Sequence, residues 1–339
     1  MKTIKIKSTT AIKMIKDLQE HIGGTINKLD NEYILNVDND LATGTICGIT
    51  VQKSISYLAF NITFKDHVTL VNTFLKSAPI YFTYCSEGNV QHSFKVNGTL
   101  NTLEAFQTAI LRSEQAATNV YHFQQDEQLK FSTIVVNTDS LSLKNELNSK
   151  LNDTFTSNSG NENYVYLGSY NLKIAEKIDQ LEQIRQEGVV RRLLIESCVQ
   201  AILALEIQQH KDDLEHASNQ FGSLSLQDME TIKEVSLFIK NYPEKQYTLK
   251  YLSTKSALSP SKLQEGFKLM HDRTVTDYIR NVRVEKAEEL IKTTDLNISE
   301  IVYTVGLTSR SYFSKIFKEK YNCSPKQYQD SQNTLAATA

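Results

Sequence analysis

The sequence predicts an α+β protein of several domains, with an antiparallel β domain and a helical hairpin in its N-terminal part and an all-α domain in its C-terminal part. Three observations support this prediction. At 339 residues the chain exceeds what one hydrophobic core usually serves. Apolar residues alternate with a period of two in the first part of the chain. Beyond Asn161 they recur every three or four residues.

The composition is that of an ordinary folded protein. Hydrophobic residues make up 40% and charged residues 22% of the chain, which argues against wholesale disorder and against a fibrous repeat. No stretch approaches about 18 uncharged apolar residues, and the start lacks the apolar run of a signal peptide. The four cysteines lie too far apart for a CxxC pair or a small disulfide framework: Cys47, Cys85, Cys198 and Cys323. We therefore expect a cytoplasmic protein that neither is secreted nor spans a membrane.

Residues 1–160 are expected to form the β domain. From Tyr33 to Val136 the apolar residues alternate with smaller or more polar ones, and this pattern predicts half-buried strands. Leu58 to Phe64 is the clearest of these runs, and 80–85 and 129–133 are similar. Turn signals stand at 86–89 and at Asn97-Gly98, and the second predicts a two-residue hairpin. Short strands at this spacing favour a sandwich or a barrel.

Residues 161–215 are expected to form a hairpin of two helices. One apolar stripe consists of Ile174, Ile178 and Leu181, and Gly188 breaks the pattern. A second stripe follows at spacings of three and four: Val190, Leu194, Cys198, Ala201 and Leu205. Both packing within the subunit and a dimer seam fit such stripes. The small, polar residues 216–225 are expected to be a linker, and 331–339 a disordered tail.

Residues 226–330 are expected to be helical because five helix starts carry capping residues. The starts are marked by Thr248, by Ser259-Pro260, by Thr274 with Asp277, by Asn297 with Glu300, and by Ser324-Pro325.

An internal repeat lies within this region. Leu249, Leu252, Leu258 and Ser259 recur 49 positions later as Ile298, Ile301, Leu307 and Thr308, and Ser261, Leu263, Phe267 and Lys268 recur 50 positions later as Ser311, Phe313, Phe317 and Lys318. Each copy therefore predicts a helix-turn-helix. The turn of the second copy contains Gly306, whereas the first contains Ala257. This alanine costs about 1 kcal/mol if the position requires a positive φ.

The second helix of each copy has an apolar inner edge and a polar outer edge. Arg and Lys can bond guanine, Gln can pair with adenine and Glu can accept from cytosine, so the outer residue types suit the major groove of DNA. One such helix alone is more typical of a solvated surface. Two matching helices, separated by the helical segment 275–293, favour two recognition helices on one face of a duplex. Residues 226–330 also hold 17 Lys/Arg against 14 Asp/Glu, a mild basic excess of +3 that suits a polyanion.

The segments that carry a resemblance are 258–263, Phe267-Lys268, Tyr278-Ile279 with Arg283, Ala287, Leu290 and Ile291, Ile298 to Ile301, Gly306-Leu307, 311–318, Ser324-Pro325 and Tyr328. Because of these segments, residues 226–330 resemble the DNA-binding domain of the AraC/XylS family of bacterial transcription regulators. The sequence departs from the family at Asp272 and Asn322, where glycine is usual. Both residue types tolerate the left-handed conformation that ends a helix, so the fold is not in doubt. Leu307 stands where Phe is common.

The resemblance implies a set of DNA contacts. The base-facing residues would be Ser261, Gln264, Glu265, Arg310, Ser311 and Lys315, and the residues near phosphates would be Lys268 and Lys318. It also implies promoter DNA and RNA polymerase as partners, and activation as the usual outcome.

The N-terminal part resembles the family less specifically. Strands followed by a helical hairpin are similar to the cupin-like effector domain and dimerising helices of these regulators. This similarity implies a homodimer and a small-molecule effector. Residues 191–205 resemble the branch that senses ferric siderophores. Neither the effector's identity nor its pocket follows from the sequence.

We expect no enzymatic activity, no cofactor and no metal site. The HxH signature of enzymatic cupins is missing, because His67, His92 and His122 are isolated, and no GxSxG, P-loop or HExxH motif occurs. Two alternatives stay open at this point. One is a cupin-fold enzyme that carries a DNA-binding tail, and the other is a dimeric DNA-binding protein that needs no effector.

Overall fold

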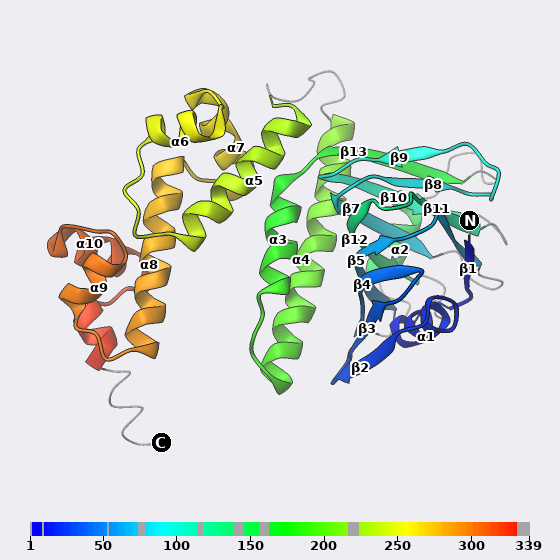
Figure 1. Cartoon of the computed structure of the whole chain (residues 1–339), viewed down its shortest axis with the longest axis horizontal. Helices are drawn as coiled ribbons and strands as arrows, with labels where there is room; N and C mark the ends of the chain where they lie inside the picture. The colour runs from blue at the N-terminus through cyan, green and yellow to red at the C-terminus, as the bar shows by residue number, and fades with distance from the viewer. Residues whose placement is uncertain are drawn as a thin grey trace. The chain divides into compact units, whose positions relative to one another are not determined.

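The computed structural model describes residues 2–8, 10–52, 54–73, 79–113, 118–137, 146–155, 163–215 and 224–330. The chain forms two compact units, Met1–Gln220 and Phe221–Ala339 (Figure 1). Most of the expected linker and the whole of the expected C-terminal tail lie outside the described residues.

The first unit contains two sheets. The larger has the strand order β13-β10-β7-β12-β5-β4-β3-β2. Its strands are β2 (Thr25–Leu29), β3 (Glu32–Asp38), β4 (Ala42–Gln52), β5 (Ile55–Phe64), β7 (Ile80–Glu87), β10 (Gln107–Arg112), β12 (Gln128–Val136) and β13 (Tyr164–Tyr170). The smaller has the order β1-β6-β11-β8-β9. Its strands are β1 (Lys2–Ile6), β6 (Val68–Thr73), β8 (Val90–Ser93), β9 (Asn101–Leu103) and β11 (Thr118–Phe123).

The strands pair antiparallel, as predicted, except that β1 runs parallel to β6. A parallel pair is possible here because helix α1 (Ala11–Ile22), which the sequence analysis missed, carries the chain from β1 to the other sheet. Gly48 on β4 lets α1 approach closely, since a Cβ at this position would lie 2.6 Å from Cγ1 of Ile15.

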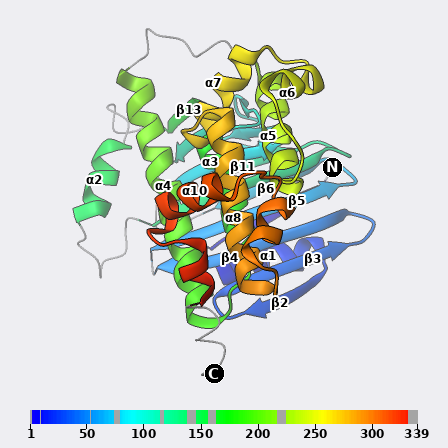
Figure 2. The same cartoon turned by 90° about the vertical axis from the view of Figure 1, so that its left-hand side faces the viewer.

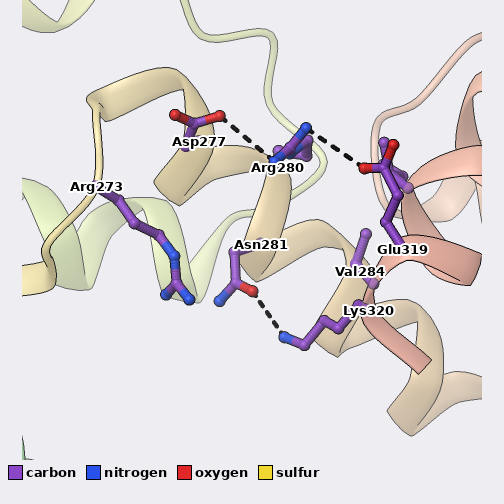
Figure 3. Close-up of a pocket in the computed structure, with 8 residues that line it drawn as sticks. Arg273, Asp277, Arg280, Asn281, Val284, Glu319 and Lys320 are labelled. Carbon is purple, nitrogen blue, oxygen red and sulfur yellow. Dashed lines mark hydrogen bonds and ion pairs between the residues drawn. The ribbon is translucent and has the colours of Figure 1, made fainter. Parts of the chain in front are cut away.

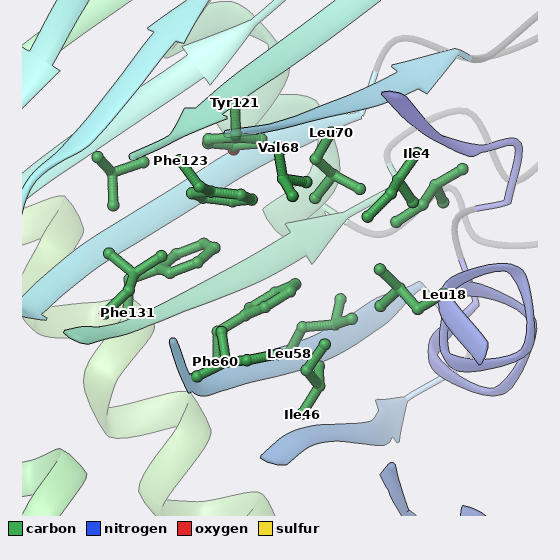
Figure 4. Packing of buried hydrophobic residues seen from close by; sticks show 14 of the residues in the cluster. Ile4, Leu18, Ile46, Leu58, Phe60, Val68, Leu70, Tyr121, Phe123 and Phe131 are labelled. Atoms are coloured by element: carbon green, nitrogen blue, oxygen red, sulfur yellow. The ribbon is translucent and has the colours of Figure 1, made fainter. Parts of the chain in front are cut away.

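The core of this unit is the space between the two sheets, and aromatic rings fill much of it (Figure 4). The register places Phe131 of β12 opposite Phe60 of β5, and their rings stack with centroids 4.4 Å apart. Phe123 of β11 stacks on Phe64 at 5.3 Å. The predicted alternation from Leu58 to Phe64 is confirmed, because its apolar members are buried in this core.

Two local predictions need correction. Residues 80–85 are buried on both faces rather than half-buried, because β7 lies between β10 and β12 and residues from both of its faces are covered. Asn97-Gly98 does not form a two-residue hairpin. The connection between β8 and β9 is longer, and within it the Gly98 N–H donates to the Lys95 carbonyl at 2.9 Å.

The helical region begins later than the pattern suggested. Strand β13 extends the larger sheet to Tyr170 by pairing with β10, and α2 (Glu146–Thr154) precedes it. The hairpin then consists of α3 (Leu172–Glu182) and α4 (Gly188–Glu215). On α3 the predicted stripe of Ile174, Ile178 and Leu181 is buried.

On α4 the buried stripe differs from the predicted one. The residues of α4 that are buried against the rest of its unit are Ile195, Val199, Ile202, Leu203, Glu206 and His210. Val190 is 57% and Leu194 37% exposed, whereas Cys198, Ala201 and Leu205 are half-buried, so the predicted stripe is exposed at its start. The two stripes have the same helical spacing, and from Ile195 onward the buried positions lie one residue after the predicted ones, as Val199 does after Cys198.

The second unit is all-α, with α5 (Leu226–Asn241), α6 (Leu249–Ser256), α7 (Pro260–His271), α8 (Val275–Thr293), α9 (Ile298–Thr304) and α10 (Arg310–Tyr321), followed by a short helix at 325–330. The predicted caps are confirmed at Thr248, Ser259 and Asn297, and Asn297 forms a complete capping box with Glu300. Thr274 caps α8, but the Asp277 carboxylate accepts from the Thr274 hydroxyl instead of from its backbone.

Candidate nucleic-acid interface

Two helix-turn-helix units, α6–α7 and α9–α10, are joined by the single helix α8 (Figure 1, Figure 2). The first half of α8 packs on the first helix-turn-helix, where Tyr278 meets the Phe267 ring edge-on at 5.2 Å. The second half packs on the second helix-turn-helix, where Val284 and Ala287 share a buried cluster with Phe313. Because one continuous helix contacts both helix-turn-helix motifs, their separation is fixed.

Hydrogen bonds from side chains to backbone carbonyls also hold the two helix-turn-helix motifs in place. Arg283 of α8 donates to the carbonyls of Pro243 and Lys245 at 2.9 and 2.7 Å, which holds the segment between α5 and α6. Gln246 in the same segment donates to the carbonyl of Gly306 in the second turn at 2.9 Å.

Both turns require the left-handed backbone conformation. Gly306 has φ 78°, and a Cβ there would lie 2.4 Å from the Glu244 carbonyl oxygen. Ala257, at the equivalent position of the first copy, has φ 57°, so the predicted strain is present. Asp272 and Asn322 end the two recognition helices at φ 54° and 59°, which confirms that both positions are left-handed caps.

In the first copy, α7 presents Ser261 and Lys268 as exposed side chains. Gln264 and Glu265 are half-buried. The Gln264 carboxamide oxygen accepts from the backbone N–H of Val275 at 3.2 Å, so it helps to cap α8. The sequence did not indicate this second role, because the partner is eleven residues away and reaches Gln264 only through the bend between the helices.

In the second copy, Arg310, Ser311, Lys315 and Lys318 are all exposed on α10. Ser309 caps this helix by accepting from the Tyr312 N–H at 3.2 Å. The Tyr312 ring is 46% exposed beside Ser311, although the set of expected base-facing residues omitted it.

A groove of about 230 Å³ lies between the first half of α8 and the end of α10 (Figure 3). Arg273, Arg280 and Lys320 line it. Arg280 pairs loosely with Asp277 and Glu319, at 3.6 and 3.8 Å. None of these three cations was among the expected phosphate contacts. Asp277 and Glu319 also line the groove, and Lys320 pairs with Glu285 at 2.6 Å, so carboxylates offset much of this positive charge.

The histidines of the first unit do not assemble a metal site. Within the described ranges no group of three or more His, Cys, Asp or Glu residues could hold a metal ion. His92 Nε2 bonds the buried Asn119 Oδ1 at 3.0 Å, and burial lowers the pKa of His92 to about 4. His122 bonds Ser93 instead, and His67 is exposed at the start of β6.

Across the part of the chain that the structure covers, no helix is both long and apolar enough to cross a membrane.

Comparison with known proteins assigns the second unit. Residues 252–331 match the family described as "Helix-turn-helix domain". Over 90 residues the chain is 37% identical to the HTH-type transcriptional regulator AlkR of Acinetobacter baylyi. The aligned segment covers 26% of this chain and 29% of that protein. It is 34% identical over 90 residues to "Histidine kinase P4" of Formosa agariphila, covering 26% of this chain and 7% of that protein. The chain therefore spans less than a third of the length of these curated relatives.

Among solved structures, that of ToxT from Vibrio cholerae aligns with a TM-score of 0.29 at 16% identity, over 82% of this chain and 98% of that one.

Proposed function

Because residues 252–331 are a helix-turn-helix domain of the AraC/XylS type, we propose that the chain is a sequence-specific DNA-binding transcriptional regulator. The observation that supports this function best is the pair of helix-turn-helix units on one connecting helix. Each unit presents a polar edge of its second helix to solvent, while its apolar edge is buried. Two such edges at a fixed separation can enter successive major grooves on one face of a duplex.

The proposed base-facing residues are those of the two polar edges. In α10, Arg310, Ser311 and Lys315 are exposed, and their side chains carry the donors and acceptors that read base edges. In α7, Ser261 and Glu265 take the same role. Gln264 also belongs here, but while its oxygen caps α8 only its amide nitrogen can donate to a base. Lys268 and Lys318 are the proposed phosphate contacts, and Arg273, just beyond the end of α7, is proposed as a third.

The test is selection of binding sites from random duplexes with the full chain. We expect enrichment of a motif with two short conserved blocks about one helical turn apart, one for each recognition helix. Enrichment of no motif, together with equal affinity for all duplexes at every salt concentration, would contradict sequence-specific binding.

A homodimer is part of this proposal. Val189, Val190, Leu193 and Leu194 expose 73%, 57%, 60% and 37% of their surface in the first two turns of α4. Single exposed apolar residues are ordinary, but four adjacent ones on one helix favour a docking face. A second copy of the chain suits this face, because dimerisation doubles the DNA site and raises affinity through effective concentration. RNA polymerase recruitment and activation by a small-molecule effector complete the proposed function.

The dimer is tested by Leu194→Glu, with sedimentation for mass and circular dichroism for folding. Since Leu194 is not part of the core, we expect a folded monomer that binds long promoter fragments more weakly. Val199→Glu is the matched control, because Val199 is fully buried one turn further along and its replacement should disrupt the fold. A folded dimer of Leu194→Glu would exclude this face as the seam.

A further inference from the structure

A cavity of about 320 Å³ lies in the first unit between the larger sheet and the α3–α4 hairpin. Most of its strand residues, such as Ala59 and Ser132, point to the face of the sheet opposite the aromatic core, while Phe60 and Phe131 of that core also line it. Its volume falls at the lower end of the range for small-molecule sites. Most of its wall is apolar, formed by Ile34, Ile49, Ala59, Ile178, Leu181 and Ile195.

Two ion pairs bridge the gap between the sheet and the hairpin at this cavity. Arg191 of α4 makes two bonds to the Glu32 carboxylate of β3, at 2.5 and 2.8 Å, and a third to the Ile184 carbonyl. Lys130 of β12 bonds Glu182 of α3 at 2.8 Å. Each pair therefore joins one strand to one helix.

The two pairs differ in how readily they can open. The Glu32 side chain is 5% exposed and Arg191 is held by three bonds, so this ion pair is costly to separate. In the other pair the Glu182 side chain is 46% exposed while Lys130 is 19% exposed. Glu182 can therefore turn into solvent at little cost, and the ammonium of Lys130 then needs another anion.

The remaining polar groups of the wall are compatible with an occupant of one negative charge. Burial and the neighbouring Glu32 raise the pKa of the Cys47 thiol to about 12, so this side chain is uncharged. Thr45 and Ser132 offer hydroxyl groups within the apolar surface. When Glu182 turns away, the Lys130 ammonium lining the cavity loses its carboxylate, whereas Arg191 stays paired with Glu32.

We propose that this cavity binds a small amphipathic monoanion, with its anionic group on Lys130 and its apolar body between the sheet and the α3–α4 hairpin. Arg191 and Ile195 line the cavity, while Val190 and Leu194, the residues directly before them on α4, belong to the proposed dimer seam. An occupant therefore touches the helix that forms the seam and shifts the dimer equilibrium. The binding site stands on the cavity alone, whereas the regulatory step rests on the proposed function.

The site is tested on the full chain with 8-anilinonaphthalene-1-sulfonate, which has an aromatic body and one sulfonate. We expect saturable binding of one probe per chain, with a rise in its fluorescence. Lys130→Met should weaken binding by about tenfold, the value of one charge-assisted bond. Ala59→Phe should abolish it, because Ala59 lines the cavity and a phenyl ring there takes up space that the probe needs. Ala59→Leu replaces it if circular dichroism shows that the phenylalanine variant is unfolded.

Two controls separate this site from other surfaces. Lys211→Met removes an exposed lysine of α4 that pairs with Glu215 at 3.8 Å, and it should leave probe binding unchanged. Leu194→Glu alters the exposed stripe outside the cavity, and one probe per chain should still bind, with an affinity changed only by the factor that couples the probe to the dimer. Probe binding that survives both cavity variants but disappears in Leu194→Glu would overturn the proposal.

The regulatory step is tested by sedimentation of the full chain with and without the probe. We expect the dimer dissociation constant to change at least threefold in the wild type and not in Ala59→Phe. A bound probe with no change in the dimer constant would overturn the regulatory step and leave the site standing. Loss of DNA binding in all conditions, measured in parallel, would instead contradict the proposed function.

Discussion

Arg310 and Lys318 occupy one helix but should act differently on DNA. Both side chains are exposed on α10, Arg310 at the first position of the helix and Lys318 more than two turns later. We expect Arg310→Ala to cost about 1 to 3 kcal/mol on the selected site and to relax preference at one base pair, whereas Lys318→Ala should weaken all sequences alike. Fluorescence anisotropy on the selected duplex and on a scrambled one at the same salt concentration distinguishes them. Equal losses of Arg310→Ala on both duplexes would remove Arg310 from the base-facing set.

Ala257 stores strain that a glycine would relieve. Its φ of 57° is unfavourable for a residue with a Cβ, and its side chain is exposed, so nothing is gained from the methyl group. Ala257→Gly should stabilise the second unit by about 1 kcal/mol in urea denaturation. Gly306→Ala is the matched comparison and should destabilise, because its Cβ would collide with the Glu244 carbonyl. No gain from Ala257→Gly would show that the turn adapts to alanine.

For single residues, the sequence predicted the helix caps and left-handed positions, which depend on neighbours in the chain. Caps such as Ser259 and Asn297, and the left-handed positions Ala257 and Asn322, follow from residues a few positions apart. The bond from Val275 to Gln264 and the three bonds of Arg191 could not be predicted, because they depend on how separate elements meet.

Among the elements, α4 shows the limit of periodicity. Its sequence carries two apolar stripes with the same spacing, and the pattern alone does not say which of them the sheet covers. The buried stripe also includes Glu206, a polar residue that would argue against burial. Strand β13 was missed for a related reason. Val165 and Leu167 are 36% and 40% exposed on it, and its place in the sheet comes from pairing with β10.

Glu206 makes the packing of α4 depend on pH. The side chain is 1% exposed, its Oε2 has no hydrogen-bond partner, and burial raises its pKa well above the usual 4.5. Between that usual value and the raised one, the unfolded chain has released the proton while the folded chain keeps it. Folding stability at Glu206 therefore falls as pH rises through this window.

Glu206→Gln should remove this pH dependence, because the amide does not ionise. In urea denaturation we expect the variant to match the wild type near about pH 4 and to be the more stable of the two near about pH 8. Glu215→Gln on the same helix is the control, since the Glu215 side chain is 57% exposed, and it should change neither value much. A constant difference between Glu206→Gln and the wild type at all pH values would contradict a raised pKa.

For the whole molecule, the repeat offset of 49 and 50 residues was the strongest predictor in the sequence. It places two helix-turn-helix units around α8, and both are present. The arrangement of the first unit was harder to predict. Residues 86–89 have the composition of a hairpin turn but carry the chain from β7 in one sheet to β8 in the other. Turn chemistry specifies a change of direction, whereas the choice of sheet depends on strands far away in the chain.

The division into two compact units predicts that the second one folds and binds DNA without the first. Helices α5 to α10, both recognition edges and all of α8 lie within 224–330. A fragment of these residues should fold and bind the selected duplex, with log K falling by about 0.9 for each neutralised phosphate per unit of log salt. It should bind more weakly than the full chain if the α4 seam makes a dimer, because it lacks that helix.

The start of this fragment matters. Ser225 caps α5 through a complete capping box with Asp228, and Asp228 also pairs with Lys262 of α7 at 2.5 Å. A fragment that begins at 226, the boundary expected from the sequence, lacks this cap. It should be less stable than the 224–330 fragment by about 1 kcal/mol in urea denaturation, while its DNA preference stays the same. A fragment that folds but binds no duplex at low salt, where the full chain does bind, would show that DNA recognition needs the first unit.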